Sequence, residues 1–168
     1  MARERREYYD INSTPTGKTY LKGDPVLKGL YPMVVMVCIQ NSEGKFLMQK
    51  RVPEKGGDYS VTGGHPKAGE TPLEGMITEI YEELGLKVLK QDLIVFDEGC
   101  DGTDCYKMYY LKKDIDITKL TLQKEELTEV KWFSIEELED MVKNKILDPN
   151  QIACFKKCIK YLQNKKTL

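Results

Sequence analysis

Three glutamates, Glu79, Glu82 and Glu83, fall within about one turn of a helix that we predict from Pro72 to Leu84. Side chains three or four residues apart share one helix face, so these carboxylates repel one another. The predicted helix contains no lysine or arginine that could offset the repulsion. A divalent cation such as Mg²⁺ or Mn²⁺, which prefers oxygen ligands, would turn the cluster into a binding site. The alternative is an ordinary solvated face of a surface helix.

The flanking residues predict a short, well-capped helix that packs on a core by its other face. Thr71 suits the N-cap, Glu74 completes a capping box with it, and Pro72 suits the first helical position. Gly85 is a natural C-terminal stop. The apolar residues recur at helical spacing, which predicts the core-facing stripe Leu73, Met76, Ile77, Ile80 and Leu84.

The segment from Gly64 to Leu86 resembles the signature box of the Nudix hydrolases, written GX5EX7REUXEEXGU with U an aliphatic residue. Eight of its nine defined positions match at the correct spacing: Gly64, Glu70, Glu79, Ile80, Glu82, Glu83, Gly85 and Leu86. The resemblance implies an α/β fold, an α/β/α sandwich with a mixed β-sheet between helices. It also implies metal-dependent hydrolysis of a phosphoanhydride bond in a nucleoside diphosphate linked to another group, or in another diphosphate.

The resemblance assigns roles to acidic residues. Glu82 and Glu83 would be the primary Mg²⁺ or Mn²⁺ ligands, and Glu79 would be a ligand or the general base. Glu126 is the best candidate for a further catalytic acid before the tryptophan-bearing strand, although a solvated acidic loop is the alternative there. Glu70 would either support its loop or lie near the metal.

Other residues are candidates for substrate binding. Arg51 follows a strand that faces the cleft in this family and could contact a phosphate through its planar fork, and Lys50 could do likewise. Surface salt bridges are the alternative for both side chains. Gly63 and Gly64, in the glycine-rich loop before the helix, are further candidates for substrate binding.

Thr78 occupies the position of the family arginine, the one mismatch in the box. The arginine helps to orient a neighbouring catalytic glutamate, and we expect the short, uncharged Thr78 side chain not to do so. The substitution predicts reduced turnover, unless another basic residue compensates. It also keeps open an alternative function, a weak or inactive Nudix fold that binds or senses a nucleotide.

Within the family, Tyr59 to Pro66 and the predicted N-terminal hairpin most resemble the branch of isopentenyl-diphosphate isomerase. Those isomerases use a cysteine where Gly63 stands and two upstream histidines as metal ligands. His65 is the only histidine of this chain, so isomerase activity is disfavoured. We expect His65 to be a hydrogen-bonding loop residue and not a ligand.

Length and charge narrow the function further. The 168 residues suit a single domain spanning 1–168, and a net charge of −1 argues against binding to nucleic-acid polymers or anionic membranes. No apolar run approaches the roughly 20 residues that span a bilayer. We therefore expect a soluble cytoplasmic protein that acts on a small diphosphate, with a homodimer possible through its tyrosine-rich hairpin.

The remaining pattern predicts intermixed strands and helices. A hairpin is expected within residues 1–25 and a C-terminal helix within 148–168, where Ile152, Phe155, Ile159 and Leu162 form one face. Predicted strands cover residues 30–40, 46–51, 59–62, 93–98, 106–112 and 129–133, and Ser134 caps a helix that ends near Lys145.

Five cysteines are present: Cys38, Cys100, Cys105, Cys154 and Cys158. In a chain expected in the cytoplasm, free thiols are the default prediction. The alternative is a structural zinc site formed by the last four.

Overall fold

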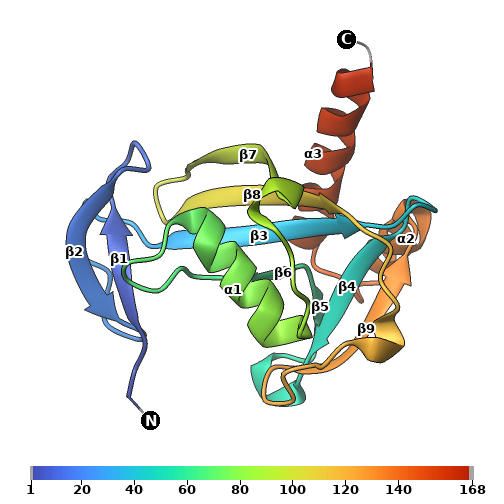
Figure 1. Ribbon diagram of the computed structural model, residues 1–168, viewed down its shortest axis with the longest axis horizontal. Coiled ribbons are helices and arrows are strands. Elements are labelled where there is room, and N and C mark those ends of the chain that lie inside the picture. The colour runs from blue at the N-terminus through green and yellow to red at the C-terminus, as the bar shows by residue number, and fades with distance from the viewer. Residues whose placement is uncertain (1, 167–168) are drawn as a thin grey trace.

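The computed structural model describes residues 2–166 and centres on a seven-stranded mixed sheet (Figure 1). Strands β3 and β8 pair in parallel at its middle, and the other pairings are antiparallel. The path runs β5-β4-β3-β8-β7, while β6 adds to β3 and β9 to β4. The strands are β3 (Met33–Gln40), β4 (Phe46–Arg51), β5 (Tyr59–Ser60), β6 (Thr62–Gly64), β7 (Ile94–Cys100), β8 (Cys105–Lys112) and β9 (Leu127–Phe133).

Helices cover both faces of this sheet, which confirms the predicted sandwich. Helix α1 (Pro72–Leu84) packs on one face, and α2 (Ile135–Lys143) and α3 (Pro149–Lys166) pack on the other (Figure 1). Successive strand residues alternate between the two cores, because side chains in a strand point to opposite faces. Val35, Val37 and Ile39 of β3 join the α1 core, whereas Cys38 joins the α3 core. Short 3-10 turns, Pro53–Lys55, Lys90–Asp92 and Ile117–Lys119, lie in the connections.

Helix α1 forms as the local sequence predicts. The Thr71 hydroxyl accepts a hydrogen bond from the Glu74 N–H, and the Glu74 carboxylate accepts one from the Thr71 N–H. Gly85 ends the helix in the left-handed conformation at φ 65°, where a side chain would be strained. The predicted stripe packs in the core, with Met76, Ile80 and Leu84 fully buried. Burial of each large side chain stabilises the fold by about 1.5–3 kcal/mol.

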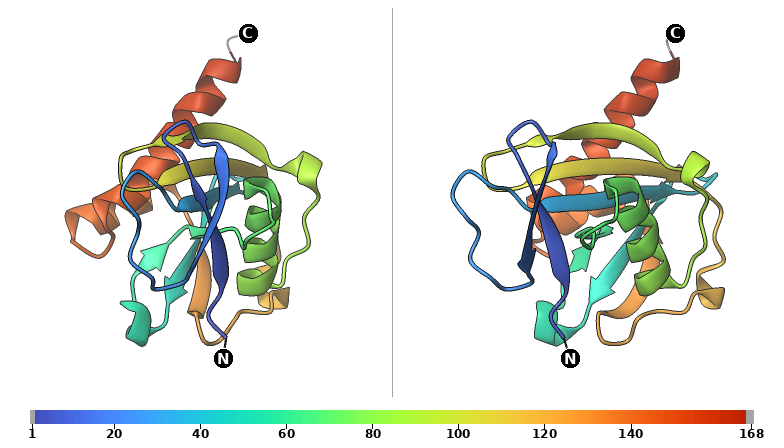
Figure 2. Two further views of the ribbon diagram at one scale, coloured as in Figure 1. Left: turned by 90° about the vertical axis from the view of Figure 1, so that its left-hand side faces the viewer. Right: turned by 60° about the vertical axis from the view of Figure 1, so that its left-hand side comes forward.

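The N-terminal hairpin is present and stands beside the sheet at one end of the molecule (Figures 1 and 2). It pairs β1 (Arg5–Tyr9) with β2 (Pro15–Leu21). Tyr8, Tyr9 and Tyr20 are buried inside the chain, and the Tyr8 and Tyr20 rings stack at 4.3 Å between centroids. The tyrosines that suggested a dimer contact are therefore used internally.

Most element boundaries agree with the sequence prediction, but the predicted strand over residues 59–62 is two strands. The chain breaks at Val61, where β5 pairs with β4 and β6 pairs with β3. The Val61 N–H instead donates to the side-chain oxygen of Gln151 on α3, so this helix is tied to the strand before the box. Within residues 2–166, no helix is long and apolar enough to cross a membrane.

The cysteines correct one prediction. Cys100 and Cys105 form a disulfide, because the β7–β8 turn places them directly opposite each other in register. Cys38, Cys154 and Cys158 are free, as predicted, and they are buried where α3 packs on the sheet. The structure does not support the alternative four-thiolate zinc site, because Cys100 and Cys105 are bonded to each other and Cys154 and Cys158 are buried in the core under α3.

Candidate active site

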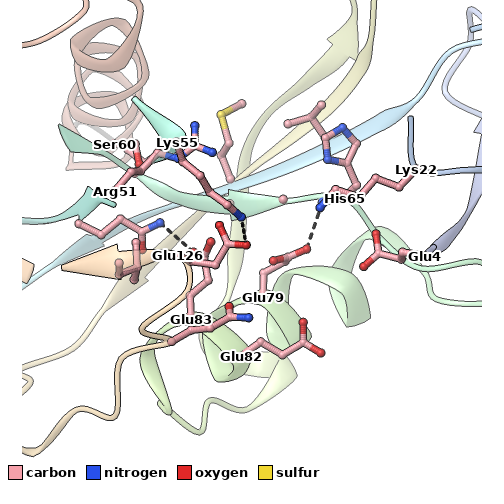
Figure 3. A pocket seen from close by; sticks show the side chains of 18 of the residues that line it. Glu4, Lys22, Arg51, Lys55, Ser60, His65, Glu79, Glu82, Glu83 and Glu126 are labelled. Atoms are coloured by element: carbon pink, nitrogen blue, oxygen red, sulfur yellow. Dashed lines mark hydrogen bonds and ion pairs between the residues drawn. The ribbon is translucent and has the colours of Figure 1, made fainter. Parts of the chain in front are cut away.

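The box glutamates meet in one polar cavity of about 490 Å³ (Figure 3). Glu79, Glu82 and Glu83 enter from α1, and Gly63 and Gly64 of β6 form part of the wall. The sheet contributes Gln49 and Arg51 from β4, and the segment before β9 contributes Glu126. The cavity therefore combines residues from parts of the chain that lie far apart in the sequence.

Glu79 lies directly against the glycine loop. A Cβ atom on Gly64 would fall 2.2 Å from the Glu79 carboxylate carbon, so only glycine leaves space for this side chain. The His65 N–H donates to Glu79 Oε1 at 3.1 Å. Burial raises the pKa of Glu79 to about 7, and the nearby charge of Glu82 contributes in the same direction.

Glu83 is held by a buried chain of hydrogen bonds. Thr62 Oγ1 donates to Gln49 Oε1 at 2.9 Å, and Gln49 Nε2 donates to Glu83 Oε2 at 2.8 Å. All three residues are buried. Burial raises the pKa of Glu83 to about 7, although the Gln49 hydrogen bond acts in the opposite direction. Because Thr62 donates to the amide oxygen, the amide presents its N–H group to the carboxylate.

Gln49 and Thr62 were missed by the sequence argument. The only signal was Gln49, a polar residue that follows three apolar residues in the strand FLMQKR and points inward. An inward polar side chain in a central strand needs a hydrogen-bond partner, which is a reason to look for one.

Glu82 and Glu126 are engaged by lysines. Lys67, in the box loop, forms an ion pair with Glu82, and this contact raises the pKa of Lys67. Lys55 forms an ion pair with Glu126 across the cavity (Figure 3). The predicted helix indeed lacks a basic residue, but the loop before it supplies one from outside.

Lys50 and Arg51 are adjacent in β4, but their side chains point to opposite faces of the sheet. Arg51 lines the cavity, as does Gln49 two residues earlier. Lys50 points to the opposite face, where its ammonium lies 5.5 Å from the centre of the Tyr59 ring. Strand alternation therefore removes the geometric basis for the expected contact of Lys50 with substrate.

Glu70 lies outside the cavity lining formed by the described residues and supports the box loop. Its carboxylate accepts hydrogen bonds from the Lys67 N–H at 2.8 Å and from the Thr78 hydroxyl at 2.7 Å. Of the two roles expected for Glu70, these contacts favour loop support. His65 also acts through its backbone, and burial lowers the pKa of its imidazole to about 4.

The chemistry of the donor set fits a hard divalent cation. Glu79, Glu82 and Glu83 offer carboxylate oxygens, the ligands that Mg²⁺ prefers. As they stand, no three ligating side chains among the described residues are arranged to hold a metal ion. Their carboxylates bond instead to the His65 N–H, to Lys67 and to Gln49.

Residues far from the box complete the cavity. Glu4, Arg6 and Lys22 of the hairpin region line it, and so does Gln151 of α3. No spacing or composition signal marks these residues in the sequence.

The comparisons with known proteins point in one direction. The model of the NUDIX domain matches residues 30–153. A Listeria monocytogenes protein named uncharacterized Nudix hydrolase lmo0368 is 35% identical over 81% of this chain and 83% of its own. An isopentenyl-diphosphate Delta-isomerase from Pectobacterium atrosepticum is 38% identical, but over only 46% of this chain and 45% of its own, so the resemblance to that branch has weak support.

A similar fold occurs in a solved structure. The crystal structure of DR0079 from Deinococcus radiodurans has a TM-score of 0.76 and is 20% identical. The similarity covers 92% of this chain and 99% of that one. At 20% identity, this similarity concerns the fold alone. It extends over most of the chain.

Proposed function

Since this chain belongs to the Nudix hydrolase family, we propose that it cleaves a phosphoanhydride bond in a small diphosphate substrate with the help of Mg²⁺ or Mn²⁺. A nucleoside diphosphate linked to another group is the expected substrate type. One observation carries the proposal: the box glutamates, Arg51 and Glu126 line the same cavity. Neither fold nor packing requires these charged groups together, and grouping them is costly unless they bind something.

In this proposal, the box glutamates bind the divalent metal ion. Glu82 and Glu83 would be the primary ligands, and Glu79 would complete the set. A bound divalent ion would neutralise the diphosphate oxygens and lower the pKa of a coordinated water. Gln49 and Thr62 keep the Glu83 carboxylate in one orientation, and the missing Cβ of Gly64 leaves room for Glu79.

The protein groups divide the remaining work. Arg51 binds a phosphate oxygen by charge-assisted hydrogen bonds. Glu126, the proposed general base, accepts a proton from the attacking water once Lys55 has moved away. The water oxygen bonds to phosphorus, the bridging P–O bond breaks, and two phosphate-bearing products leave. One water is consumed for each anhydride cleaved, with no other reactant.

Two alternatives predict different outcomes. A non-catalytic module that senses nucleotides would bind diphosphates without releasing product, and Thr78 is the residue that favours this reading. An isomerase would convert isopentenyl diphosphate without cleaving it. Gly63 at the position of the isomerase cysteine, and a single histidine, argue against that activity.

A substrate panel tests the proposal. Phosphate or nucleotide release is measured with Mg²⁺ and with Mn²⁺ against nucleotide sugars, ADP-ribose, dinucleoside polyphosphates and isopentenyl diphosphate. Glu82→Gln should abolish metal-dependent release, and Glu126→Gln should lower kcat by about 10²–10⁴-fold. Glu125→Gln, an exposed neighbour outside the cavity, is the control and should behave as wild type. Hydrolysis that survives Glu82→Gln contradicts the assignment.

The proposal also covers the binding partner, the location and the oligomeric state of the protein. Its partner is a small molecule, and neither a nucleic-acid polymer nor a membrane is required. A cytoplasmic location and a homodimer remain expectations. Fractionation of cells checks the first, and gel filtration with light scattering checks the second.

A further inference from the structure

The N-terminal hairpin builds one end of the cavity although it lies outside the segment matched by the family. The family model begins at residue 30, whereas Glu4, Arg6 and Lys22 line the cavity beside the box. A side chain that lines the cavity can contact a bound molecule. This end of the cavity is therefore a feature of this chain that the domain match does not describe.

Hydrogen bonds hold the hairpin against the box loop and against the segment that precedes β3. The Ala68 N–H donates to Arg5 O at 2.8 Å, and Tyr9 and Tyr31 exchange two backbone hydrogen bonds of 2.8 and 2.9 Å. The Lys22 N–H also donates to Glu4 O at 2.8 Å, which fixes the backbone of Lys22 against β1. These backbone hydrogen bonds place Lys22 beside the cavity.

The charges at this end leave one cation without a partner. Arg6 Nε donates to Glu4 Oε1 at 2.6 Å, so these two opposite charges offset each other. Lys22 has no ion pair among residues 2–166. The hairpin end therefore carries an uncompensated positive charge.

A second free cation lies across the site. Arg51 also lines the cavity without an ion pair in the described part of the chain. Figure 3 shows Arg51 and Lys22 on opposite sides of the box glutamates. If Arg51 binds the diphosphate, Lys22 remains available for an anionic group at the other end.

The lining favours phosphate over a stacked base. No Phe, Tyr or Trp is among the described residues that line the cavity. Stacking on such rings is a common way of holding a nucleobase. A lysine ammonium is instead a well-suited point-charge partner for phosphate.

We propose that the hairpin forms a phosphate subsite, with Lys22 as its main ligand and Arg6 beside it, so that the preferred substrate carries a phosphomonoester in addition to the scissile diphosphate. This inference rests on the proposed function for the position of the diphosphate. Lys22 is a specificity residue and takes no part in the bond cleavage.

Matched pairs of diphosphates test the subsite. Coenzyme A and dephospho-coenzyme A differ by one ribose phosphate, as do NADPH and NADH. We expect kcat/KM to favour the phosphorylated member of a pair by about tenfold, the size of one charge-assisted hydrogen bond. The ratio should fall to near one in Lys22→Gln and persist in Lys22→Arg. Lys18→Gln, an exposed hairpin lysine outside the cavity, should keep the wild-type ratio.

Binding measurements separate this inference from the proposed function. Dissociation constants of the four compounds are measured by calorimetry with wild type and Lys22→Gln. A binding preference that depends on Lys22 supports the subsite even without turnover, whereas the lack of any hydrolysis counts against the proposed function alone. Equal affinities within both pairs, or a preference unaffected by Lys22→Gln, overturn the subsite.

Discussion

Thr78 Oγ1 donates a 2.7 Å hydrogen bond to Glu70 Oε1, which joins the middle of helix α1 to the loop that precedes it. Thr78 stands at the family's arginine position, and Glu70 is the first glutamate of the box. We expected Thr78 not to orient a neighbouring glutamate, yet it does contact this one. No hydrogen bond joins Thr78 to Glu79, Glu82 or Glu83 in the part of the chain that the structure describes. Its effect on turnover stays a prediction.

The hydroxyl of Thr78 should stabilise the box loop. Thr78→Val keeps the shape and removes the donor to the half-buried Glu70 carboxylate. We expect the free energy of unfolding to fall by about 1 kcal/mol, as measured by urea denaturation. Thr78→Ser retains the donor and serves as the control. Equal stability of the valine and serine variants would show that the bond contributes nothing.

A guanidinium at position 78 should raise turnover. Arginine could reach beyond Glu70 and hold a catalytic carboxylate in its working rotamer, and catalysis is sensitive to placement errors near 1 Å, worth about 100-fold. Thr78→Arg should therefore raise kcat with little change in KM, because the contact acts on reacting geometry and not on uniform binding. Steady-state kinetics on the best panel substrate checks this. A flat or lower kcat in a folded variant means that another residue already provides the orientation.

Gly64→Ala should displace Glu79 without unfolding the chain. The added Cβ would fall 2.2 Å from the carboxylate, whose flexible side chain can swing away at the cost of its bond to the His65 N–H. We expect kcat to fall by about 100-fold, with the circular dichroism spectrum unchanged. Gly99→Ala is the matched control, since the atoms nearest to its Cβ would be those of the Tyr106 side chain, at 3.2 Å or more. Full activity of Gly64→Ala would remove Glu79 from the mechanism.

Gln49 and Thr62 should act on Glu83 as one unit. Gln49→Leu leaves a buried hydroxyl and a buried carboxylate each without a partner, which should cost about 1–3 kcal/mol of stability and lower kcat. Thr62→Val removes only the group that orients the amide, so its effect should be smaller. In a double-mutant cycle of unfolding free energies, the two changes should be non-additive. Additive losses of unfolding free energy would mean that the hydrogen-bond chain from Thr62 through Gln49 to Glu83 does not form in solution.

The metal-free protein should lose stability as pH rises from about 4.5 to 7. Burial raises the pKa of Glu79 and of Glu83 to about 7, so in this window the native state binds more protons than the unfolded state. The free energy of unfolding then decreases with pH. Lowered pKa values, such as that of Glu74 at about 2, where the hydrogen bond from Lys90 is the main cause, act below this window.

Urea unfolding in the presence of a chelator, from pH 5 to pH 8, measures this slope. Glu83→Gln cannot ionise, so its stability should fall less steeply than that of wild type across the same range. The difference between the two proteins reports the titration of Glu83 together with its electrostatic effect on the neighbouring Glu79. Parallel pH profiles would show that Glu83 titrates normally in the folded protein.

The sequence by itself determined helix α1 and the signature box, and the resemblance of that box implied the family and the sandwich. These rest on local rules: the spacing of the box, the Thr71 cap, the Gly85 stop, and alternation in strands. It also determined that three glutamates share one helix face. Such features depend on residues within a few positions of one another, so no long-range contact is needed to infer them.

Only the tertiary structure decided which groups meet those glutamates. Gln49 reaches Glu83 across 34 positions, and Lys55 reaches Glu126 across 71. Arg51 faces the cavity and Lys50 does not, because the side of β4 on which α1 packs fixes the direction of every residue in the strand. Lys22 and Gln151 join from opposite ends of the chain. Partners so distant in sequence are set by how the layers pack, and no local pattern records that arrangement.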